Sequence, residues 1–218
     1  PFAEYAVREI LLFSLLWILV GVAAVIWLHP LAATLPLALL VFTLCFFRDP
    51  WRAIPEHTDV LLSPADGKIV ELREVEEEEF LKGPCVKVGI FLSVFNVHIN
   101  RAPWSGRVAE TSYRKGKFLN ALFERSSVEN ESNAIVIADE RGRTKVLVRQ
   151  IAGAIARRIV CACRPGDRVE RGQKIGMIKF GSRTELYVPL RGEGTFEPAV
   201  RVGDKVKAGE TILGSYRI

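Results

Sequence analysis

One serine in the sequence could act as a nucleophile toward its own backbone. Ser182 follows Gly181, and the pair lies between two apolar runs that are typical of strands. Glycine allows strained torsions and close approach of the chain, and a serine hydroxyl attacks a carbonyl carbon once a base removes its proton. Glycine and serine are also common turn residues. The pair therefore indicates chemistry only if a base and an orienting carboxylate accompany it.

A histidine and an aspartate could supply that base and that carboxylate. The sequence has three histidines. His29 lies in an apolar segment and His57 in a polar stretch, so His98, at the end of a long apolar run, is the candidate base. Asp66 is the candidate carboxylate that orients it. The structural alternatives are a solvated histidine at a strand end and a plain hairpin turn at Asp66-Gly67.

Short strands are the elements that must position these side chains. A proline-containing linker, residues 50–58, leads into residues 59–218, where brief apolar runs alternate with turn residues, the pattern of a mainly β domain. The strands expected from the pattern are residues 60–62, 68–72, 86–95, 108–113, 134–138, 144–151 and 159–163. Residues 115–123 are expected to be a short helix or a long loop.

An internal repeat refines the expected fold. Residues 166–176 and 203–214 share the frame Gly-Asp-x-Val-x-x-Gly. The frame predicts a turn, a short β-step, a second glycine turn and another strand, as in the small β-sandwich of biotin and lipoyl carrier domains. We therefore expect a lipoyl-like or barrel-sandwich-like β domain built from two quasi-equivalent halves.

The amino-terminal region has the composition of a membrane anchor. Residues 10–47 contain no Asp, Glu, Lys or Arg, and a helix needs about 20 apolar residues to cross a bilayer core. Arg8 precedes the segment, and Arg48 and Arg52 follow it, which places both of its ends in the cytoplasm. We expect residues 1–49 to form a transmembrane or re-entrant helical hairpin. The alternative is a buried hairpin of a soluble domain.

Charge and cysteine content narrow the class of protein further. The formal net charge is +5, which suits an anionic lipid surface or nucleic acid. Basic residues interleaved with aromatic ones are not evident, so no nucleic-acid partner is expected. The four cysteines lack the spacing of a disulfide framework, which favours a reduced, cytosol-facing domain. Cys161 and Cys163 are expected to pack in a strand; half of a metal site is the alternative, and no metal is expected.

Three motifs in the chain resemble those of the phosphatidylserine decarboxylase family. They are residues 63–67 (Ser-Pro-Ala-Asp-Gly), 96–103 (Asn-Val-His-Ile-Asn-Arg-Ala-Pro) and 180–183 (Phe-Gly-Ser-Arg). The resemblance covers residues 59–218, and the membrane hairpin fits the short, archaeal-type branch of the family. Three motifs in the right order are far more specific than any one of them.

The resemblance implies a proenzyme that cuts its own backbone between Gly181 and Ser182. The Ser182 hydroxyl attacks the Gly181 carbonyl, and the products are residues 1–181 and residues 182–218, the second capped by a pyruvoyl group. The pyruvoyl ketone condenses with the amine of phosphatidylserine and accepts electrons as carbon dioxide leaves, which yields phosphatidylethanolamine. The two chains are expected to form a heterodimer, with assembly into a higher oligomer left open. The expected location is the inner membrane, with the catalytic domain facing the cytoplasm.

The resemblance assigns catalysis to Ser182, His98 and Asp66, but the chain departs from the family at one position. Longer members carry two histidines three residues apart, and the second is credited with self-cleavage. In this sequence Arg101 stands at that second position. Either His98 therefore serves both cleavage and decarboxylation, or this branch activates Ser182 differently.

Contacts with the substrate head group are also expected. Arg101 and Lys115 could meet the phosphate or the carboxylate. Asn130 and Glu131 lie in a segment that resembles one of the family and could bind the head group. A polar loop is the alternative for that segment.

A non-enzymatic class of protein competes with the decarboxylase. The repeat and the amino-terminal segment also suit a membrane-anchored lipoyl-like carrier or efflux-adaptor protein, in which Lys179 would be the modified lysine. The signature of such carriers is missing around Lys179, and no heptads are visible for the coiled coil of an adaptor. The sequence therefore favours the pyruvoyl-dependent enzyme.

Overall fold

The chain forms two units in the computed structural model, Pro1–Trp51 and Arg52–Ile218. The residues that the structure describes are 2–57, 59–123, 125–139, 142, 144–154, 158–179, 182–190 and 195–217.

The first unit is a pair of apolar helices. A short 3-10 helix, η1 (Glu4–Ala6), leads into α1 (Val7–Trp27), and a second, η2 (Pro30–Ala33), leads into α2 (Thr34–Phe46). The two α-helices pack together, and the Trp17 indole donates a hydrogen bond to the Thr43 hydroxyl over 3.2 Å. The segment Glu4–Trp27 is long and apolar enough to cross a membrane, whereas Pro30–Phe46 is a shorter apolar helix.

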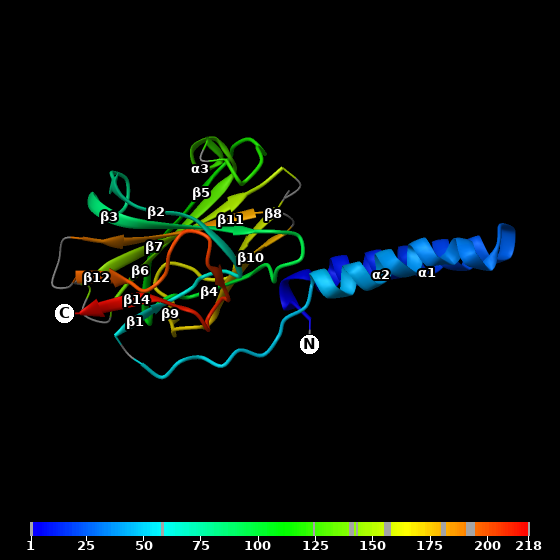
Figure 1. Cartoon of the computed structure of the whole chain (residues 1–218), viewed down its shortest axis with the longest axis horizontal. Coiled ribbons are helices and arrows are strands. Elements are labelled where there is room, and N and C mark those ends of the chain that lie inside the picture. The colour runs from blue at the N-terminus through cyan, green and yellow to red at the C-terminus, as the bar shows by residue number, and fades with distance from the viewer. Residues whose placement is uncertain are drawn as a thin grey trace. The chain divides into compact units, whose positions relative to one another are not determined.

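The second unit is mainly β, which confirms the coarse prediction of fold class (Figure 1). Among the described residues, the large sheet has eight strands in the order β13-β2-β3-β11-β7-β6-β5-β9, and two three-stranded sheets have the orders β1-β14-β12 and β4-β10-β8. The elements are β1 (Val60–Leu62), β2 (Gly67–Glu77), β3 (Gly83–Leu92), β4 (Ile99–Arg101), β5 (Gly106–Arg114), α3 (Arg125–Glu129), β6 (Ser132–Ala138), β7 (Lys145–Ala152), β8 (Arg158–Cys161), β9 (Arg168–Val169), β10 (Lys174–Lys179), β11 (Ser182–Pro189), β12 (Thr195–Pro198), β13 (Lys205–Val206) and β14 (Ile212–Arg217).

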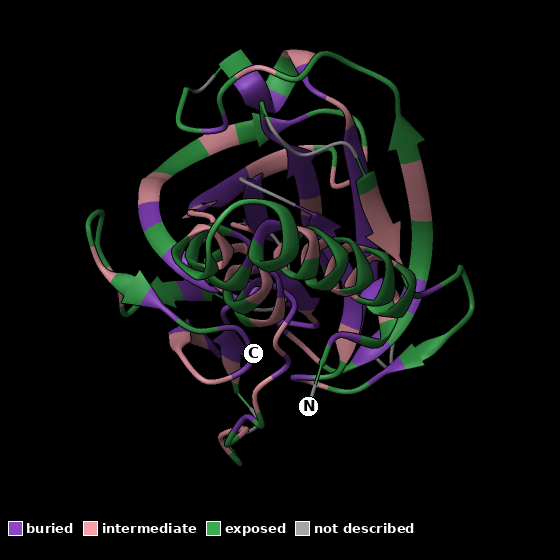
Figure 2. Cartoon of the chain, turned by 90° about the vertical axis from the view of Figure 1, so that its right-hand side faces the viewer, coloured by how far each residue is buried: buried purple, intermediate pink, exposed green. Residues whose placement is uncertain are grey.

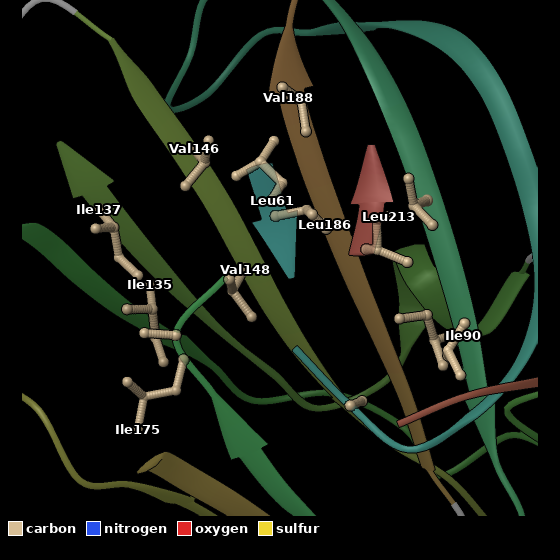
Figure 3. Packing of buried hydrophobic residues seen from close by; sticks show 14 of the residues in the cluster. Leu61, Ile90, Ile135, Ile137, Val146, Val148, Ile175, Leu186, Val188 and Leu213 are labelled. Carbon is tan, nitrogen blue, oxygen red and sulfur yellow. The ribbon is translucent and has the colours of Figure 1, made fainter. Parts of the chain in front are cut away.

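The core lies between the large sheet and the two small ones. Figure 3 shows branched aliphatic side chains from several strands meeting there, among them Ile90, Val148 and Leu186. Because successive residues of a strand point to opposite faces, alternate residues of each strand line this core. Figure 2 shows buried stretches along the strands of the second unit, whereas both helices of the first unit are largely exposed.

The sequence repeat forms two equivalent turns at opposite edges of the large sheet. The first copy contributes the edge strand β9 and the second contributes the edge strand β13. In each copy the amide of the first glycine donates to the carbonyl of one residue of a long strand, and the amide of that residue donates to the carbonyl of the aspartate. The strand residue is Val108 for the first copy and Ile69 for the second, and the distances are 2.8 to 2.9 Å. The predicted turn, short β-step, turn and strand are thus present twice.

The equivalence extends to a second pair of segments that the sequence analysis missed. Residues 64–69 and 103–108 both read Pro-x-x-Gly-x-Ile/Val. The Leu62 amide donates a hydrogen bond to the Pro103 carbonyl, and the Arg101 amide donates one to the Pro64 carbonyl. Both distances are 3.0 Å, and each donor stands two positions before the proline of its own segment. The two halves of the domain are therefore joined by a reciprocal pair of backbone bonds.

The structure corrects four expectations from the sequence, one of them the alternative of a hairpin turn at Asp66-Gly67. The strand predicted to reach residue 95 ends at Leu92, because the Asn96 side chain accepts hydrogen bonds from the amide and hydroxyl of Ser93 and so stabilises a turn. His98 consequently does not end that strand but directly precedes β4, in another sheet. Asp66-Gly67 is not a hairpin turn, because β1 pairs with β14 whereas β2 pairs with β3 and β13. The strand predicted for residues 159–163 ends at Cys161.

The glycines that open β2 and β5 should resist substitution. A Cβ atom at Gly106 would lie 2.0 Å from the Ala138 carbonyl oxygen, and one at Gly67 would lie 2.2 Å from the Phe91 carbonyl oxygen. Since a backbone atom cannot swing aside, Gly106→Ala should lower the free energy of unfolding by about 2 kcal/mol or more. Gly83→Ala is the matched control, because no atom lies within 4 Å of its added Cβ. Thermal unfolding of the two variants should therefore differ, and equal melting temperatures would contradict the close approach.

Candidate active site

Ser182 begins the central strand of the large sheet. In β11 it pairs with Leu92 of β3 on one side and with Ala152 of β7 on the other. Ser182 is fully buried, and its Oγ has no hydrogen-bond partner in the described part of the chain. A buried hydroxyl without a partner costs about 1–3 kcal/mol, which is a signal of function. Phe180 and Gly181 lie outside the described residues.

His98 is also fully buried, immediately before β4. Its Nδ1 lies 2.9 Å from the carbonyl oxygen of Asn96. A carbonyl oxygen only accepts hydrogen bonds, so in the neutral ring Nδ1 carries the proton and Nε2 keeps the lone pair. This tautomer is the one that a general base acting through Nε2 needs.

The segment that carries His98 and the strand that begins at Ser182 are connected through neighbouring residues. The Ile178 amide donates to the His98 carbonyl over 3.1 Å, and the Ile178 side chain packs against Ala152, the strand partner of Ser182. Asn100 of β4 donates from Nδ2 to the Thr184 hydroxyl over 2.9 Å. Thr184 lies on the same face of β11 as Ser182, since side chains two positions apart in a strand point to the same face. The structure thus brings the predicted nucleophile and base to one part of the domain.

A network of hydrogen bonds between buried polar side chains holds the strands around Ser182 and His98 together. The Gln150 amide donates to Asn100 Oδ1 over 2.9 Å, and the Asn133 amide donates to Gln150 Oε1, also over 2.9 Å. Together with Thr184, this hydrogen-bond network joins β11, β4, β7 and β6 through buried side chains. Satisfied polar networks of this kind hold one arrangement of the surrounding strands. Sequence reasoning missed it, although Asn100 lies inside the motif of residues 96–103.

Asp66 is bound to an arginine. Both of its carboxylate oxygens accept from Arg52 Nη2, at 2.9 and 2.8 Å, and Oδ1 also accepts from the Ala208 amide at 2.8 Å. Asp66 precedes β2, and β3 separates β2 from β11, so two strand spacings, about 10 Å, lie between the backbones of β2 and β11. Arg52, which the sequence analysis treated only as part of the positively charged flank of the membrane segment, is a buried ion-pair partner.

Most of the residues expected to bind the head group make hydrogen bonds within the protein. Arg101 Nη1 donates to the Gly172 carbonyl over 2.8 Å, and the exposed Lys115 lies in the loop after β5. Asn130 is buried and donates to the carbonyls of Leu119 and Ala152 over 2.8 and 2.7 Å. The Glu131 carbonyl accepts from the Ala152 amide over 2.9 Å. Asn130 and Glu131 thus anchor a loop beside the strand partner of Ser182, and their role toward substrate stays a prediction.

The opposite face of β11 carries a buried charge cluster that the sequence analysis missed. Arg183 Nε donates to Glu185 Oε1 over 2.7 Å, and Lys87 Nζ lies 2.9 Å from the same oxygen. The hydroxyls of Ser127 and Tyr187 donate to the Glu185 carboxylate over 2.6 and 2.7 Å. Burial raises the pKa of Glu185, but Lys87 and Arg183 outweigh it and hold the pKa below its ordinary value. The signal in the sequence was the alternation of polar residues along positions 183–187.

The two cysteines of the predicted packing pair lie close together. Cys163 is buried in the core, Cys161 packs against it at the edge, and their sulfurs are 3.8 Å apart. A hydrogen bond from the Cys163 thiol lowers the pKa of Cys161 to about 6. Among the described residues no group of three His, Cys, Asp or Glu side chains is placed to hold a metal ion.

This combination defines a class of protein: a β domain with a buried serine hydroxyl that has no partner in the described part of the chain and a buried histidine whose tautomer suits a base. Comparison with known proteins then identifies the family. Residues 39–214 match the family model described as phosphatidylserine decarboxylase. The chain therefore belongs to the phosphatidylserine decarboxylase family, and the resemblance inferred from the motifs is confirmed.

Individual relatives carry the same name. The phosphatidylserine decarboxylase proenzyme of Syntrophus aciditrophicus is 48% identical over 184 residues, which is 84% of each chain. The proenzyme of Rhodopirellula baltica is 45% identical over 219 residues, covering 100% of this chain and 89% of that one. The proenzyme of Desulfotalea psychrophila is 46% identical over 173 residues, covering 79% and 78%.

The charge cluster predicts how stability depends on pH. Because the folded-state pKa of Glu185 lies below its ordinary 4.5, the stabilisation is complete above about pH 4.5 and is lost as the pH falls through the folded-state value. Glu185→Gln should lower the free energy of unfolding at pH 7 by about 3 kcal/mol, since it leaves Glu71 as the one carboxylate among the described residues that pairs with both buried cations, Lys87 and Arg183. The difference in the free energy of unfolding between this variant and the wild type should become smaller below pH 4.5. Unfolding measured from pH 7 to pH 3 tests this.

The exposed Glu78 provides the matched control for that measurement. Glu78→Gln should change stability by no more than about 0.5 kcal/mol. A Glu185→Gln variant that is as stable as Glu78→Gln at pH 7 would contradict the importance of the cluster.

Proposed function

We propose that this chain decarboxylates phosphatidylserine to phosphatidylethanolamine after it cuts itself between Gly181 and Ser182. Membership of the phosphatidylserine decarboxylase family supports the reaction, and the relatives' name of proenzyme supports a maturation step. The observation that carries the self-cleavage is the buried Ser182 hydroxyl with no partner in the described part of the chain. A carrier or adaptor protein would have no use for such a hydroxyl.

The surroundings of Ser182 fit a pyruvoyl group made from that residue. Its Oγ is buried, and it stands at the first position of a strand held on both edges, so a new chain end there would be fixed in place. A pyruvoyl ketone supplies an electron sink for the electrons released when carbon dioxide leaves. The buried site also excludes water, which strengthens electrostatic interactions with the reacting groups.

The other site residues are proposed to move or orient a proton. His98 Nε2 removes the proton from Ser182 Oγ, while the bond from Nδ1 to the Asn96 carbonyl keeps the ring in the required tautomer. Asp66 stays a candidate site residue, held by its bonds to Arg52 and the Ala208 amide, whereas the described bond that orients the His98 ring goes to Asn96. Arg101 and Lys115, with Asn130 and Glu131, are the candidates for contacts with the head group.

The two products of the cut are proposed to stay together as a heterodimer. Residues 182–218 contribute β11, which lies between β3 and β7, and β14, which pairs with β1. Separation of the products would remove the central strand of the large sheet and expose its core side chains, such as Leu186. Loss of that buried apolar surface makes dissociation unfavourable.

The amino-terminal unit is proposed to anchor the enzyme in the inner membrane. The helix within Glu4–Trp27 is long and apolar enough to span a bilayer. Arg8 and Arg48 lie at the two ends of the apolar region, which by the distribution of positive charge places the catalytic domain in the cytoplasm. Residues 1–49 would then hold the β domain beside its lipid substrate, with residues 50–58 as the connection.

Removing the proposed nucleophile should block maturation. Ser182→Ala should remain one chain of about 24.3 kDa and release no carbon dioxide from phosphatidylserine, because alanine has no hydroxyl with which to attack the Gly181 carbonyl. Ser112→Ala, at a half-buried serine of β5, is the control and should mature normally. Intact mass under denaturing conditions reports both results. A Ser182→Ala protein that is still cut at this bond, or is still active, would refute the proposal.

Removing the proposed base should slow the cut. His98→Ala should reduce the rate of self-cleavage by about 10²–10⁴-fold, which is the usual contribution of a general base. His57→Ala is the matched control, because His57 is exposed and belongs to the connecting segment. The fraction of cut chain is followed over time in freshly synthesised protein. If both variants mature at the wild-type rate, the base is another group.

A further inference from the structure

A loop beside the site exposes an unusual number of large apolar side chains. The loop comprises residues 115–131, and its described part includes α3. Phe118, Leu122, Phe123 and Val128 are 41%, 50%, 65% and 69% exposed. Soluble surfaces carry single exposed apolar residues without consequence, but a contiguous group marks an interaction site.

The loop is held in place at its base. Lys117 and the Glu129–Glu131 segment exchange backbone hydrogen bonds of 2.7 and 3.0 Å. The Asn130 side chain bonds both the amide and the carbonyl of Leu119, each over 2.8 Å. A Cβ at Gly116 would lie 2.3 Å from the Asn130 carbonyl carbon, so the backbone packs closely there. The apolar side chains are therefore presented by a defined backbone.

The base of the loop is one strand away from Ser182. Asn130 donates to the carbonyl of Ala152, the strand partner of Ser182, over 2.7 Å. Ser127 of α3 bonds the Glu185 carboxylate on β11 itself. On the other side of β11, Phe95 is 74% exposed in the turn that follows β3. Exposed apolar side chains thus flank the start of β11 on both sides.

Basic residues accompany the apolar ones. Arg114 ends β5, the exposed Lys115 follows it, and Lys117 and Arg125 share the Glu129 carboxylate over 2.8 and 2.5 Å. Aromatic and aliphatic side chains that sit among basic groups are typical of surfaces that enter the interface of a membrane with anionic lipids.

The geometry points to the loop of residues 115–131 as a second membrane contact, one that seats the region around the start of β11 on the surface of a bilayer containing anionic phospholipid. This inference rests on the proposed function, because a lipid must leave the bilayer to reach a buried Ser182. Phe118, Leu122, Phe123 and Val128 enter the interfacial region. Arg114 and the exposed Lys115, which do not share the Glu129 carboxylate with Lys117 and Arg125, face the head groups. Substrate then passes from the bilayer to the site without crossing water.

Photocrosslinking tests the contact without relying on activity. p-Benzoylphenylalanine replaces Phe123 in the full-length chain, reconstituted in vesicles of phosphatidylethanolamine and phosphatidylglycerol. Irradiation should add the mass of a phospholipid at position 123. The same replacement at Val202, which is 57% exposed on the turn before β13, should give no lipid adduct. A crosslink from position 123 to a second copy of the chain, or no adduct at all, would overturn the proposal.

Kinetics separate failure of this inference from failure of the proposed function. Phe123→Ser should raise the KM for phosphatidylserine in vesicles by about tenfold, the loss expected from one large apolar contact, and leave the rate with a short-chain, water-soluble phosphatidylserine unchanged. Val202→Ser should change neither. A Phe123→Ser variant with unaltered KM for the vesicles overturns the membrane contact. A wild-type protein that is inactive on both substrates contradicts the proposed function instead, while the lipid adduct can still be scored.

Discussion

The structure depends on the hydrogen bonding of β11 along both of its edges. The strand pairs with β3 from Ser182 to Pro189 and with β7 from Ser182 to Tyr187. A strand in this position has almost no unpaired backbone, so it keeps its place even if the chain is broken immediately before it. A protein that cuts itself at Ser182 needs this property, since the new chain end must remain where the old peptide was.

The two faces of β11 carry different kinds of side chain. On the inner face, Ser182 and Thr184 are hydroxyl residues, and Thr184 is tied to Asn100 while the Ser182 hydroxyl has no partner in the described part of the chain. On the outer face, Arg183 and Glu185 belong to a cluster of buried opposite charges. Buried ion pairs add little net stability, but they penalise any shift that separates the partners. The outer cluster therefore holds the register of the strand, and the inner face is left available for chemistry.

Local sequence patterns predicted those parts of the molecule that depend on neighbouring residues. The Gly-Asp-x-Val-x-x-Gly frame predicted both edge turns, because glycine and aspartate specify turns by themselves. The end of β3 was predicted wrongly, because an apolar run does not reveal that Asn96 will bond back to Ser93. The partners of Asp66 and Asn100 were missed because Arg52 and Gln150 lie 14 and 50 residues away from them in the chain. Only the fold brings such groups together, whereas the motifs alone were enough to predict Ser182 and His98 as site residues.

The arginine at position 101 limits what the base can be. A guanidinium group remains protonated at all physiological pH values, so Arg101 cannot remove a proton from Ser182. Its Nη1 donates to the Gly172 carbonyl, which ties β4 to the turn of the first sequence repeat. One residue earlier, Asn100 ties the same strand to β11 through Thr184. Arg101 thus holds β4 in place, and His98, whose tautomer is set by Asn96, stays the proposed proton acceptor of this motif.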